Sequence, residues 1–291
     1  MSDPDTTPRI PVRKTYKLYI GGTFPRSESG RSYPVTDHKD RFLANAALAS
    51  RKDARDAVTA ARKAFAGWSA ATAYNRGQVL YRVAELLEGR RAQFAAEVRA
   101  AEGAAARQAE ALVDEAIDRW VWYAGWADKL AQVRGAANPV AGPYFSFSLP
   151  EPTGVVAVVA PQASSLLGFV SVVAPAVVGG STVVALASER CPLPAVSLSE
   201  VLATSDVPGG VINVLTGRTA EIAPWLASHM DVNAIDLCGA PDGLADDLAV
   251  AAAENLKRVV KHGEQDWTLT PGLERMLAYL ETKTVWHPAS I

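Results

Sequence analysis

The chain has 291 residues, and its two cysteines, Cys191 and Cys238, are the candidate nucleophiles. A cysteine attacks a carbonyl carbon as a thiolate, which a neighbouring histidine or cation stabilises. Cys238 closes an apolar run and Cys191 precedes Pro192, and neither has a histidine beside it in the sequence. We therefore interpret both as small packing residues, with a nucleophilic role for Cys238 kept as an alternative.

The residue types that hold metal ions or phosphates lack the spacing that those sites need. No G-x-G-x-x-G run follows an apolar segment, and Gly179-Gly180 alone is more typical of a helix end. Asp242, Asp246 and Asp247 suit the positive end of a helix dipole. The four histidines show no ligand-like spacing, and they are His38, His229, His262 and His287. The sequence predicts no metal site.

Composition excludes several classes of partner. The chain has 29 Lys+Arg against 31 Asp+Glu, so neither nucleic acid nor an anionic membrane is expected to bind it by bulk charge. Prolines, glycines and polar residues interrupt the uncharged stretch 152–188, so we expect no membrane span. Two cysteines suit a reducing compartment, and we predict a cytoplasmic protein. Residues 1–14 are polar and proline-containing, which predicts a disordered tail.

Residues 15–134 are expected to hold the N-terminal strands followed by helices. Apolar residues at three-to-four spacing predict a first helix around 54–68, a second over about 75–99 and a third over about 106–133. The aromatic residues of the third stretch lie at helical spacing, so we interpret them as a packing face. From Tyr144 to Leu149, aromatic and small polar residues alternate. This pattern predicts a strand with one buried face, within a hairpin at 135–150.

Residues 151–262 alternate short apolar runs with helical stretches. Runs without polar alternation are typical of parallel strands that are buried on both faces, and five occur here: 155–160, 182–186, 211–215, 232–237 and 256–260. Helices are expected to begin near Ser165, Leu193, Ala220 and Gly243. The sequence predicts an α/β fold with a doubly wound, Rossmann-like parallel sheet. In 263–291 we expect a short helix and a strand at 283–286 that pairs at long range or with another chain.

Several motifs stand out along the chain. They are Leu18-Tyr19-Ile20-Gly21-Gly22, Asp56-Ala57-Val58-Thr59-Ala60-Ala61-Arg62-Lys63-Ala64-Phe65, Glu151-Pro152-Thr153-Gly154-Val155-Val156, Pro208-Gly209-Gly210-Val211-Ile212-Asn213-Val214-Leu215-Thr216-Gly217 and Asn255-Leu256-Lys257-Arg258-Val259. Together they resemble the aldehyde dehydrogenase superfamily, in which the same motifs occur in this order. The tail from Gly272 to Val285 is similar to the extreme C-terminus of the family. The resemblance implies a truncated form that lacks the catalytic domain.

The resemblance also implies that the catalytic residues are missing. The segment with the nucleophilic cysteine belongs to the absent domain, and Ala163 stands where the family has its oxyanion-binding asparagine, two residues after Pro161. The family's glutamate base falls at or near 261–264, where its pattern is lost, and we interpret Glu264 as a turn carboxylate. We therefore assign no catalytic residue.

The cofactor residues that the resemblance implies are degenerate. Leu186-Ala187-Ser188-Glu189 replaces Lys-Pro-Ser-Glu, so the ribose-binding lysine is lost and Glu189 survives. Gly239-Ala240 replaces the pyrophosphate-binding Gly-Ser. Gly217 is retained, but the glycines that follow it become Thr219 and Ala223. Each lost hydrogen bond weakens binding by on the order of 1–3 kcal/mol. We expect no cofactor, with NAD(P) binding at most weakly.

An oligomerisation arm is the surface that the resemblance leaves intact. In the family it comprises the N-terminal strand pair, the hairpin and the C-terminal strand, and it joins the catalytic-domain sheet of a neighbouring subunit. We expect the interface to include Tyr144, Phe145, Phe147, Lys283, Val285 and Trp286. The expected partner is a full-length aldehyde dehydrogenase in a hetero-oligomer, or a second copy in a homo-oligomer.

Two alternative functions follow from the same residues. One is an oxidoreductase with residual NAD(P)-dependent activity that uses Cys238 or a partner's catalytic residues. The other is a nucleotide-binding sensory module in which Ser164 and Ser165 contact the ligand, although helix capping explains these serines more simply.

Overall fold

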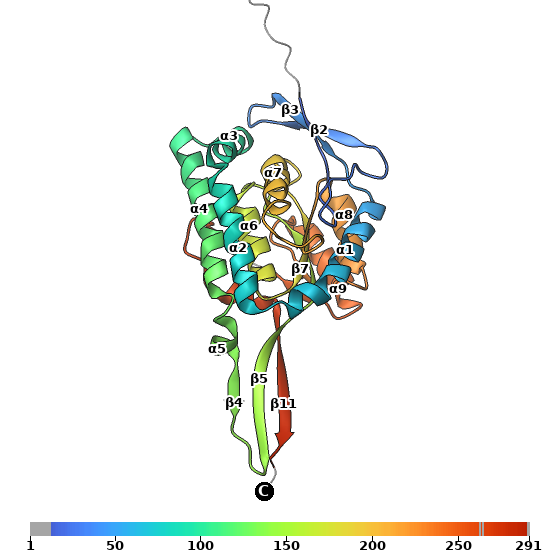
Figure 1. The fold of residues 1–291 in the computed structure, drawn as a ribbon. Helices are drawn as coiled ribbons and strands as arrows, with labels where there is room; N and C mark the ends of the chain where they lie inside the picture. The colour runs from blue at the N-terminus through green and yellow to red at the C-terminus, as the bar shows by residue number, and fades with distance from the viewer. Residues whose placement is uncertain (1–12, 262, 264, 290–291) are drawn as a thin grey trace, which may run out of the picture.

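A computed structural model describes residues 13–261, 263 and 265–289. The described chain forms a layered α/β body from which a narrow arm projects (Figure 1), and the arm is a three-stranded sheet. The predicted tail therefore lies mostly outside the described residues, as do His262 and Glu264. None of the described helices combines the length and apolarity that a membrane span needs.

A five-stranded parallel sheet forms the centre of the body. Its order is β10-β9-β6-β7-β8, and its strands are β6 (Val155–Val159), β7 (Thr182–Leu186), β8 (Ile212–Leu215), β9 (Ala234–Asp236) and β10 (Arg258–Val260). Every residue of β6 and β7 is buried. The predicted parallel sheet is confirmed, with β9 and β10 shorter than their apolar runs.

Alternate residues of each strand face two different hydrophobic cores. Val156 and Val158 of β6 pack into one core, whereas Val155, Ala157 and Val159 pack into the other. This alternation is why helices cover both faces of the sheet. The crossover helices begin within two residues of the expected positions, and they are α6 (Leu167–Val178), α7 (Leu193–Leu202), α8 (Thr219–Ser228) and α9 (Asp242–Ala253).

The N-terminal helices depart from the expected boundaries. They are α1 (Arg51–Ala70), α2 (Ala73–Glu88), α3 (Arg91–Glu102), α4 (Ala106–Trp126) and α5 (Leu130–Arg134). The single helix expected over 75–99 is wrong, because the chain turns at Gly89 and Arg90 between α2 and α3. Glycine is a poor helix former, and the turn lets Leu87 and Phe94 both be fully buried. The third helix ends at Trp126 rather than near 133.

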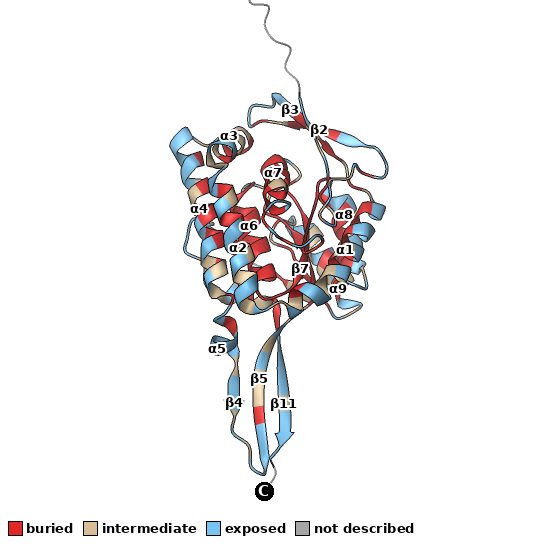
Figure 2. Cartoon of the chain, viewed as in Figure 1, coloured by how far each residue is buried: buried red, intermediate tan, exposed pale blue. Residues whose placement is uncertain are grey.

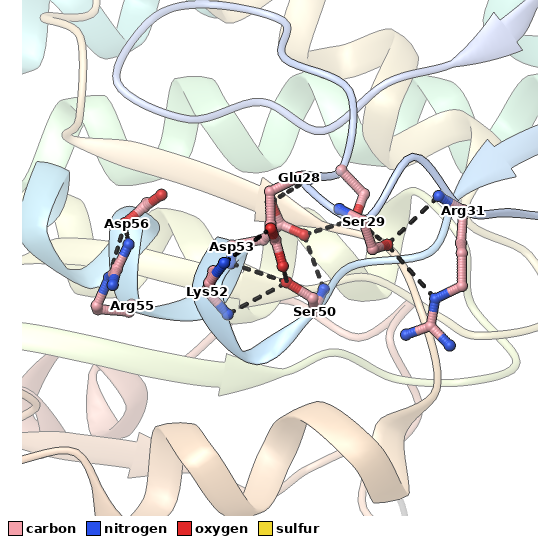
Figure 3. A network of polar contacts seen from close by, with 9 residues as sticks. Glu28, Ser29, Arg31, Ser50, Lys52, Asp53, Arg55 and Asp56 are labelled. Atoms are coloured by element: carbon pink, nitrogen blue, oxygen red, sulfur yellow. Dashed lines mark hydrogen bonds and ion pairs between the residues drawn. The ribbon is translucent and has the colours of Figure 1, made fainter.

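The start of α1 is fixed by a capping box. The Ser50 hydroxyl accepts from the backbone N–H groups of Lys52 and Asp53, and the Asp53 carboxylate accepts from the Ser50 N–H at 2.7 Å (Figure 3). Asp53 also accepts from the Ser27 hydroxyl at 2.7 Å and from the Glu28 N–H at 3.1 Å. This network ties the preceding loop to the helix, and its polar groups bond one another.

Three short N-terminal strands form a separate sheet at the end of the body opposite the arm (Figure 1). They are β1 (Thr15–Tyr16), β2 (Ser32–Thr36) and β3 (Phe42–Ala47), in the order β1-β3-β2. Tyr33 and Val35 pack with Leu193 at the start of α7 in a small core of their own. The expectation that the N-terminal strands belong to the arm is therefore wrong.

The arm consists of β4 (Ala136–Asn138), β5 (Tyr144–Pro152) and β11 (Leu280–Pro288), in the order β11-β5-β4. The nine-residue strands β5 and β11 pair antiparallel without a register shift, and the short helix α10 (Glu274–Ala278) leads into β11. The strand expected at 283–286 thus pairs at long range within the chain. The arm is mostly exposed (Figure 2). The expected buried face of 144–149 is therefore wrong for a single chain, where only Ser146 of these residues is buried.

Candidate functional site

The candidate site lies at the carboxyl ends of the parallel strands, where open α/β sheets bind ligands. Two hollows lie there. The larger, about 770 Å³, is lined by residues that include Pro161, Cys238 and Trp267. The smaller, about 520 Å³, lies beside Tyr33 and Leu244. Both volumes fall within the range of small-molecule sites, about 300–1,000 Å³.

Glu189, the retained cofactor residue, is bonded within the chain. Its carboxylate accepts from Arg218 Nη1 at 2.6 Å and from the backbone N–H of Thr219 at 3.0 Å. The guanidinium of Arg218 lies 5.2 Å from the centre of the Tyr33 ring. Glu189 therefore caps the start of α8 and neutralises a neighbouring cation. A ribose hydroxyl would compete with both contacts.

Gln162 bridges the two loops that follow β6 and β7. Its side-chain amide donates to the Ala160 carbonyl at 2.9 Å and accepts from the Glu189 N–H at 2.9 Å. The Ser188 hydroxyl donates to the Gln162 carbonyl at 2.9 Å. Sequence reasoning missed this residue. Its position directly after Pro161, at the end of a buried strand, was the available signal.

Gly217 and Gly239 are required by packing. Gly217 has a φ of +154°, and a Cβ atom there would lie 3.3 Å from the backbone nitrogen of Ala49. A Cβ atom on Gly239 would lie 1.8 Å from the carbonyl oxygen of Ala160. The Gly239 N–H donates to the Val159 carbonyl at 2.9 Å. Both glycines are thus explained by close approach of two backbone segments.

Neither cysteine has the environment of a thiolate. Cys238 is half-buried at the larger hollow, and burial, with a smaller effect of Asp236, raises the pKa of its thiol. Arg275 Nη2 lies 3.8 Å from Cys238 Sγ and opposes that shift. Cys191 is buried and donates to the Ala101 carbonyl at 3.3 Å, and burial raises its pKa also. Burial therefore favours the neutral thiol of both cysteines, as in packing residues.

A buried polar cluster joins the end of β9 to the C-terminal segment. The Asp236 side chain is fully buried, and its Oδ2 accepts from Tyr279 OH at 2.5 Å and from Arg275 Nη1 at 3.1 Å. Its Oδ1 accepts from the Cys238 N–H at 2.8 Å. Arg275 stacks 5.0 Å from the centre of the Trp267 ring. Sequence reasoning missed this cluster because Asp236 lay within an apolar run.

The serines of the loop after β6 also have partners within the chain. Ser164 Oγ accepts from the Gly168 N–H at 2.9 Å, which is a helix-capping contact. The Ser165 N–H and hydroxyl donate to Glu102 Oε1 at 2.7 and 2.6 Å. Burial raises the pKa of Glu102. Across the described part of the chain, no cluster of ligating side chains could hold a metal ion.

The residues expected at an interface lie together on the arm. Tyr144, Phe145 and Trp286 are 47%, 57% and 59% exposed. The Tyr144 and Trp286 rings pack edge to face with centres 5.9 Å apart, and the Phe145 and Phe147 rings are 5.5 Å apart. The two remaining residues line β11: Val285 pairs with Phe147 in the strand register, and Lys283 forms an ion pair with Glu151 at 2.9 Å. The arm thus carries exposed aromatic rings on paired strands.

Comparison with known proteins gives one consistent result. The sequence model of the Aldehyde dehydrogenase family matches residues 24–263. Aldehyde dehydrogenase family 2 member B4, mitochondrial, from Arabidopsis thaliana is 34% identical over 256 residues, which are 87% of this chain and 47% of the relative. Human Retinal dehydrogenase 2 is 34% identical over 261 residues, which are 88% and 50% of the two chains. The chain spans about half the length of these relatives.

Solved structures agree with the fold. HpcC from Thermus thermophilus superimposes with a TM-score of 0.81 and 30% identity, over 85% of this chain and 48% of that one. The NAD+ complex of an aldehyde dehydrogenase from Bacillus cereus has a TM-score of 0.81 and 24% identity, over 85% and 50% of the two chains. The expected resemblance and the expected α/β fold are confirmed.

Proposed function

This chain belongs to the aldehyde dehydrogenase family, and we propose that it is a non-catalytic subunit that associates with a full-length aldehyde dehydrogenase. The observation that carries the proposal is the projecting arm, which is mostly exposed (Figure 2). Its exposed residues include the aromatic side chains of Tyr144, Phe145 and Trp286. A strand edge and large apolar side chains left in water favour association with another protein.

The segment that links the body to the arm supports a structural role. Residues 261–279 lead from β10 directly to β11, and within the described residues they form only the short helix α10. Asp236 anchors this segment through Arg275 and Tyr279. The base of the arm is therefore fixed to the central sheet, which suits an element that presents a surface to a partner.

The chemistry of the crevice supports the absence of catalysis by the chain alone. Oxidation of an aldehyde in this family requires a thiolate and a bound nicotinamide, whereas burial raises the pKa of the Cys191 and Cys238 thiols and so favours their neutral form. Glu189 and Gln162 are bonded to their own chain. These residues do not fit a dinucleotide held as in the family, and we propose that NAD(P) binds at most weakly.

Co-expression tests the association. The chain carries an affinity tag and is produced with the most similar full-length aldehyde dehydrogenase of its source organism. We expect both proteins to elute from size exclusion as one complex. Phe145→Ser should weaken the complex about tenfold or more, because exposed aromatic side chains dominate interfaces. Tyr74→Ser is the matched control, since Tyr74 is 67% exposed on α2 in the body. Independent elution of the two wild-type proteins would refute the proposal.

Residual activity is the alternative that the family suggests. Assay of the purified chain with NAD or NADP and short aldehydes decides between the two functions, with Cys238→Ala as control. Turnover that Cys238→Ala abolishes would establish the chain as an enzyme and overturn the non-catalytic assignment.

A nucleotide-binding module is the second alternative, and it would use the smaller hollow, which Arg218 and Thr219 line. Arg218 would have to leave Glu189 to contact an anionic group. Calorimetric titration with NAD, NADP and AMP tests this alternative. A dissociation constant below about 0.1 mM, or −5.5 kcal/mol, would favour the module and contradict the proposal that NAD(P) binds at most weakly.

A further inference from the structure

The outer edge of β11 is a nine-residue strand edge with no neighbour among residues 13–261, 263 and 265–289. Two backbone bonds bracket its ladder with β5. The Thr153 N–H donates to the Tyr279 carbonyl at 3.0 Å, and the Ala289 N–H donates to the Pro143 carbonyl at 2.8 Å. In an antiparallel ladder, bonded pairs recur at every second residue. The odd-numbered residues of β11 therefore bond to β5, and the even-numbered ones direct their backbone groups outward.

The two ends of this outer edge offer complementary backbone groups for hydrogen bonding. The Leu280 carbonyl already accepts from Arg258 Nη1 at 3.0 Å, so Leu280 offers its N–H alone. Pro288 has no N–H and offers its carbonyl alone. Between them, Thr282, Thr284 and Trp286 each offer both a donor and an acceptor. An antiparallel copy of the same edge satisfies this pattern when Leu280 lies opposite Pro288.

We propose that two copies of this chain associate by antiparallel pairing of their β11 edges, with the two-fold axis at Thr284. Thr284 then pairs with Thr284 of the second copy, and Thr282 pairs with Trp286. The result is a continuous six-stranded sheet in the order β4-β5-β11-β11-β5-β4. The inference does not rest on the proposed function, because it concerns the chain without another partner.

Side chains favour this register over its neighbours. Glu281 faces His287 of the second copy, an acid opposite a base, and Lys283 faces Val285. A shift of two residues one way places the two Lys283 side chains opposite each other, which is unfavourable. The same shift pairs Trp286 with Leu280, whose carbonyl is occupied. A shift the other way places Thr282 opposite Pro288, which leaves one carbonyl without a donor.

A second copy fits this edge because few of the devices that prevent self-pairing occur in it. Natural edge strands carry bulges, lysines and other charged side chains, inward-facing charges or prolines. The β5–β11 register has no shift, and the proline of β11 is its last residue. The Lys283 side chain forms an ion pair with Glu151 on the adjacent strand, and its backbone faces β5. The middle of the outer edge is therefore open to another strand.

Disulfide trapping tests the register. Directly opposed residues in a bonded antiparallel pair have Cα atoms about 5.5 Å apart, within the reach of a disulfide. Mild oxidation of Thr284→Cys should therefore give a covalent dimer that a reductant reverses. Lys283→Cys is the matched control, because position 283 lies opposite Val285 and projects from the other face. That variant and the wild type, with Cys191 and Cys238, should stay free of covalent dimer.

Light scattering after size exclusion tests the association without a cross-link. The wild-type chain should have twice the mass of one 30.8 kDa chain at high concentration. Thr284→Pro removes an outward N–H and should weaken the dimer at least tenfold, whereas Thr284→Ala should leave it intact. A monomeric wild type, or cross-linking of Lys283→Cys equal to that of Thr284→Cys, would overturn the inference. A monomer that still binds a full-length aldehyde dehydrogenase would refute the self-pairing and leave the proposed function standing.

Discussion

Replacement of Asp236 by asparagine tests whether the buried cluster at the end of β9 holds the C-terminal segment in place. The Asp236 side chain is fully buried, and the side chain of its partner Arg275 is 11% exposed. Asparagine keeps the shape of the side chain and removes the charge. The change leaves the guanidinium of Arg275 buried without a carboxylate. The amide nitrogen of the asparagine must face either the Cys238 N–H or the two donors Tyr279 and Arg275, so at least one hydrogen bond to residue 236 is lost.

The expected loss follows from these contacts. Removal of one partner from a buried ion pair destabilises a protein by about 3–5 kcal/mol, because the remaining charge is left without compensation. Tyr279→Phe removes only the hydrogen bond to the carboxylate, which contributes about 1.5–3 kcal/mol when the acceptor is charged. Asp236→Asn should therefore lower the free energy of unfolding more than Tyr279→Phe does.

Urea denaturation followed by circular dichroism measures both losses. The double variant Asp236→Asn, Tyr279→Phe should lose less than the sum of the single variants, because the two residues share one contact. Thr268→Ala is a control on the same segment, since its hydroxyl donates to Asp266, two residues away, at 2.7 Å. Additive effects, or losses below about 1 kcal/mol for Asp236→Asn, would show that the cluster is not a coupled buried network.

Three further predictions use other groups. Burial raises the pKa of Tyr123 to about 12. The free energy of unfolding should therefore fall as the pH rises above about 10, where the tyrosine of the unfolded chain ionises. Denaturation measured at several pH values should show a smaller fall for Tyr123→Phe. Gly239→Ala places a Cβ against the Ala160 carbonyl after β6 and should destabilise the chain by about 1–3 kcal/mol. Gly243→Ala lies in open space within α9 and should leave the stability unchanged or raise it. Thermal melting measures both effects. Iodoacetamide should modify Cys191 and Cys238 slowly at pH 7.5 and quickly after unfolding; fast labelling of the native chain would contradict their assignment as neutral thiols.

The pattern of apolar residues along the sequence predicted the central sheet well, because its strands are buried on both faces. The run at 182–186 is β7 to the residue, and the helix expected near Leu193 begins there. The strand predicted from the run at 232–237 is less accurate, since β9 covers only Ala234–Asp236. Apolar patterning shows where a strand is buried, but it does not show where its ladder of hydrogen bonds stops.

The polar contacts of the site could not be predicted because they join residues that are far apart in the sequence. Glu189 is a residue that the family resemblance identifies, but its bond to Arg218 depends on how β7 and α8 are placed. Asp236 and Arg275 are 39 positions apart and meet only when the C-terminal segment returns to the sheet. The arm shows the same limit, since the partner of residues 283–286 is β5, more than one hundred residues earlier.

The polar residues at the carboxyl ends of the strands are used differently from those of a binding crevice. In open α/β sheets such residues usually meet a ligand. Here Gln162, Glu189 and Asp236 each bond to their own chain, and Asp236 holds the residues that lead into β11. A ligand in the crevice would have to break several of these contacts before it gained its own. A strand that joins the outer edge of β11 breaks none of them, because that edge offers backbone groups that face away from β5. Association at the arm therefore requires fewer internal hydrogen bonds to break than ligand binding in the crevice does.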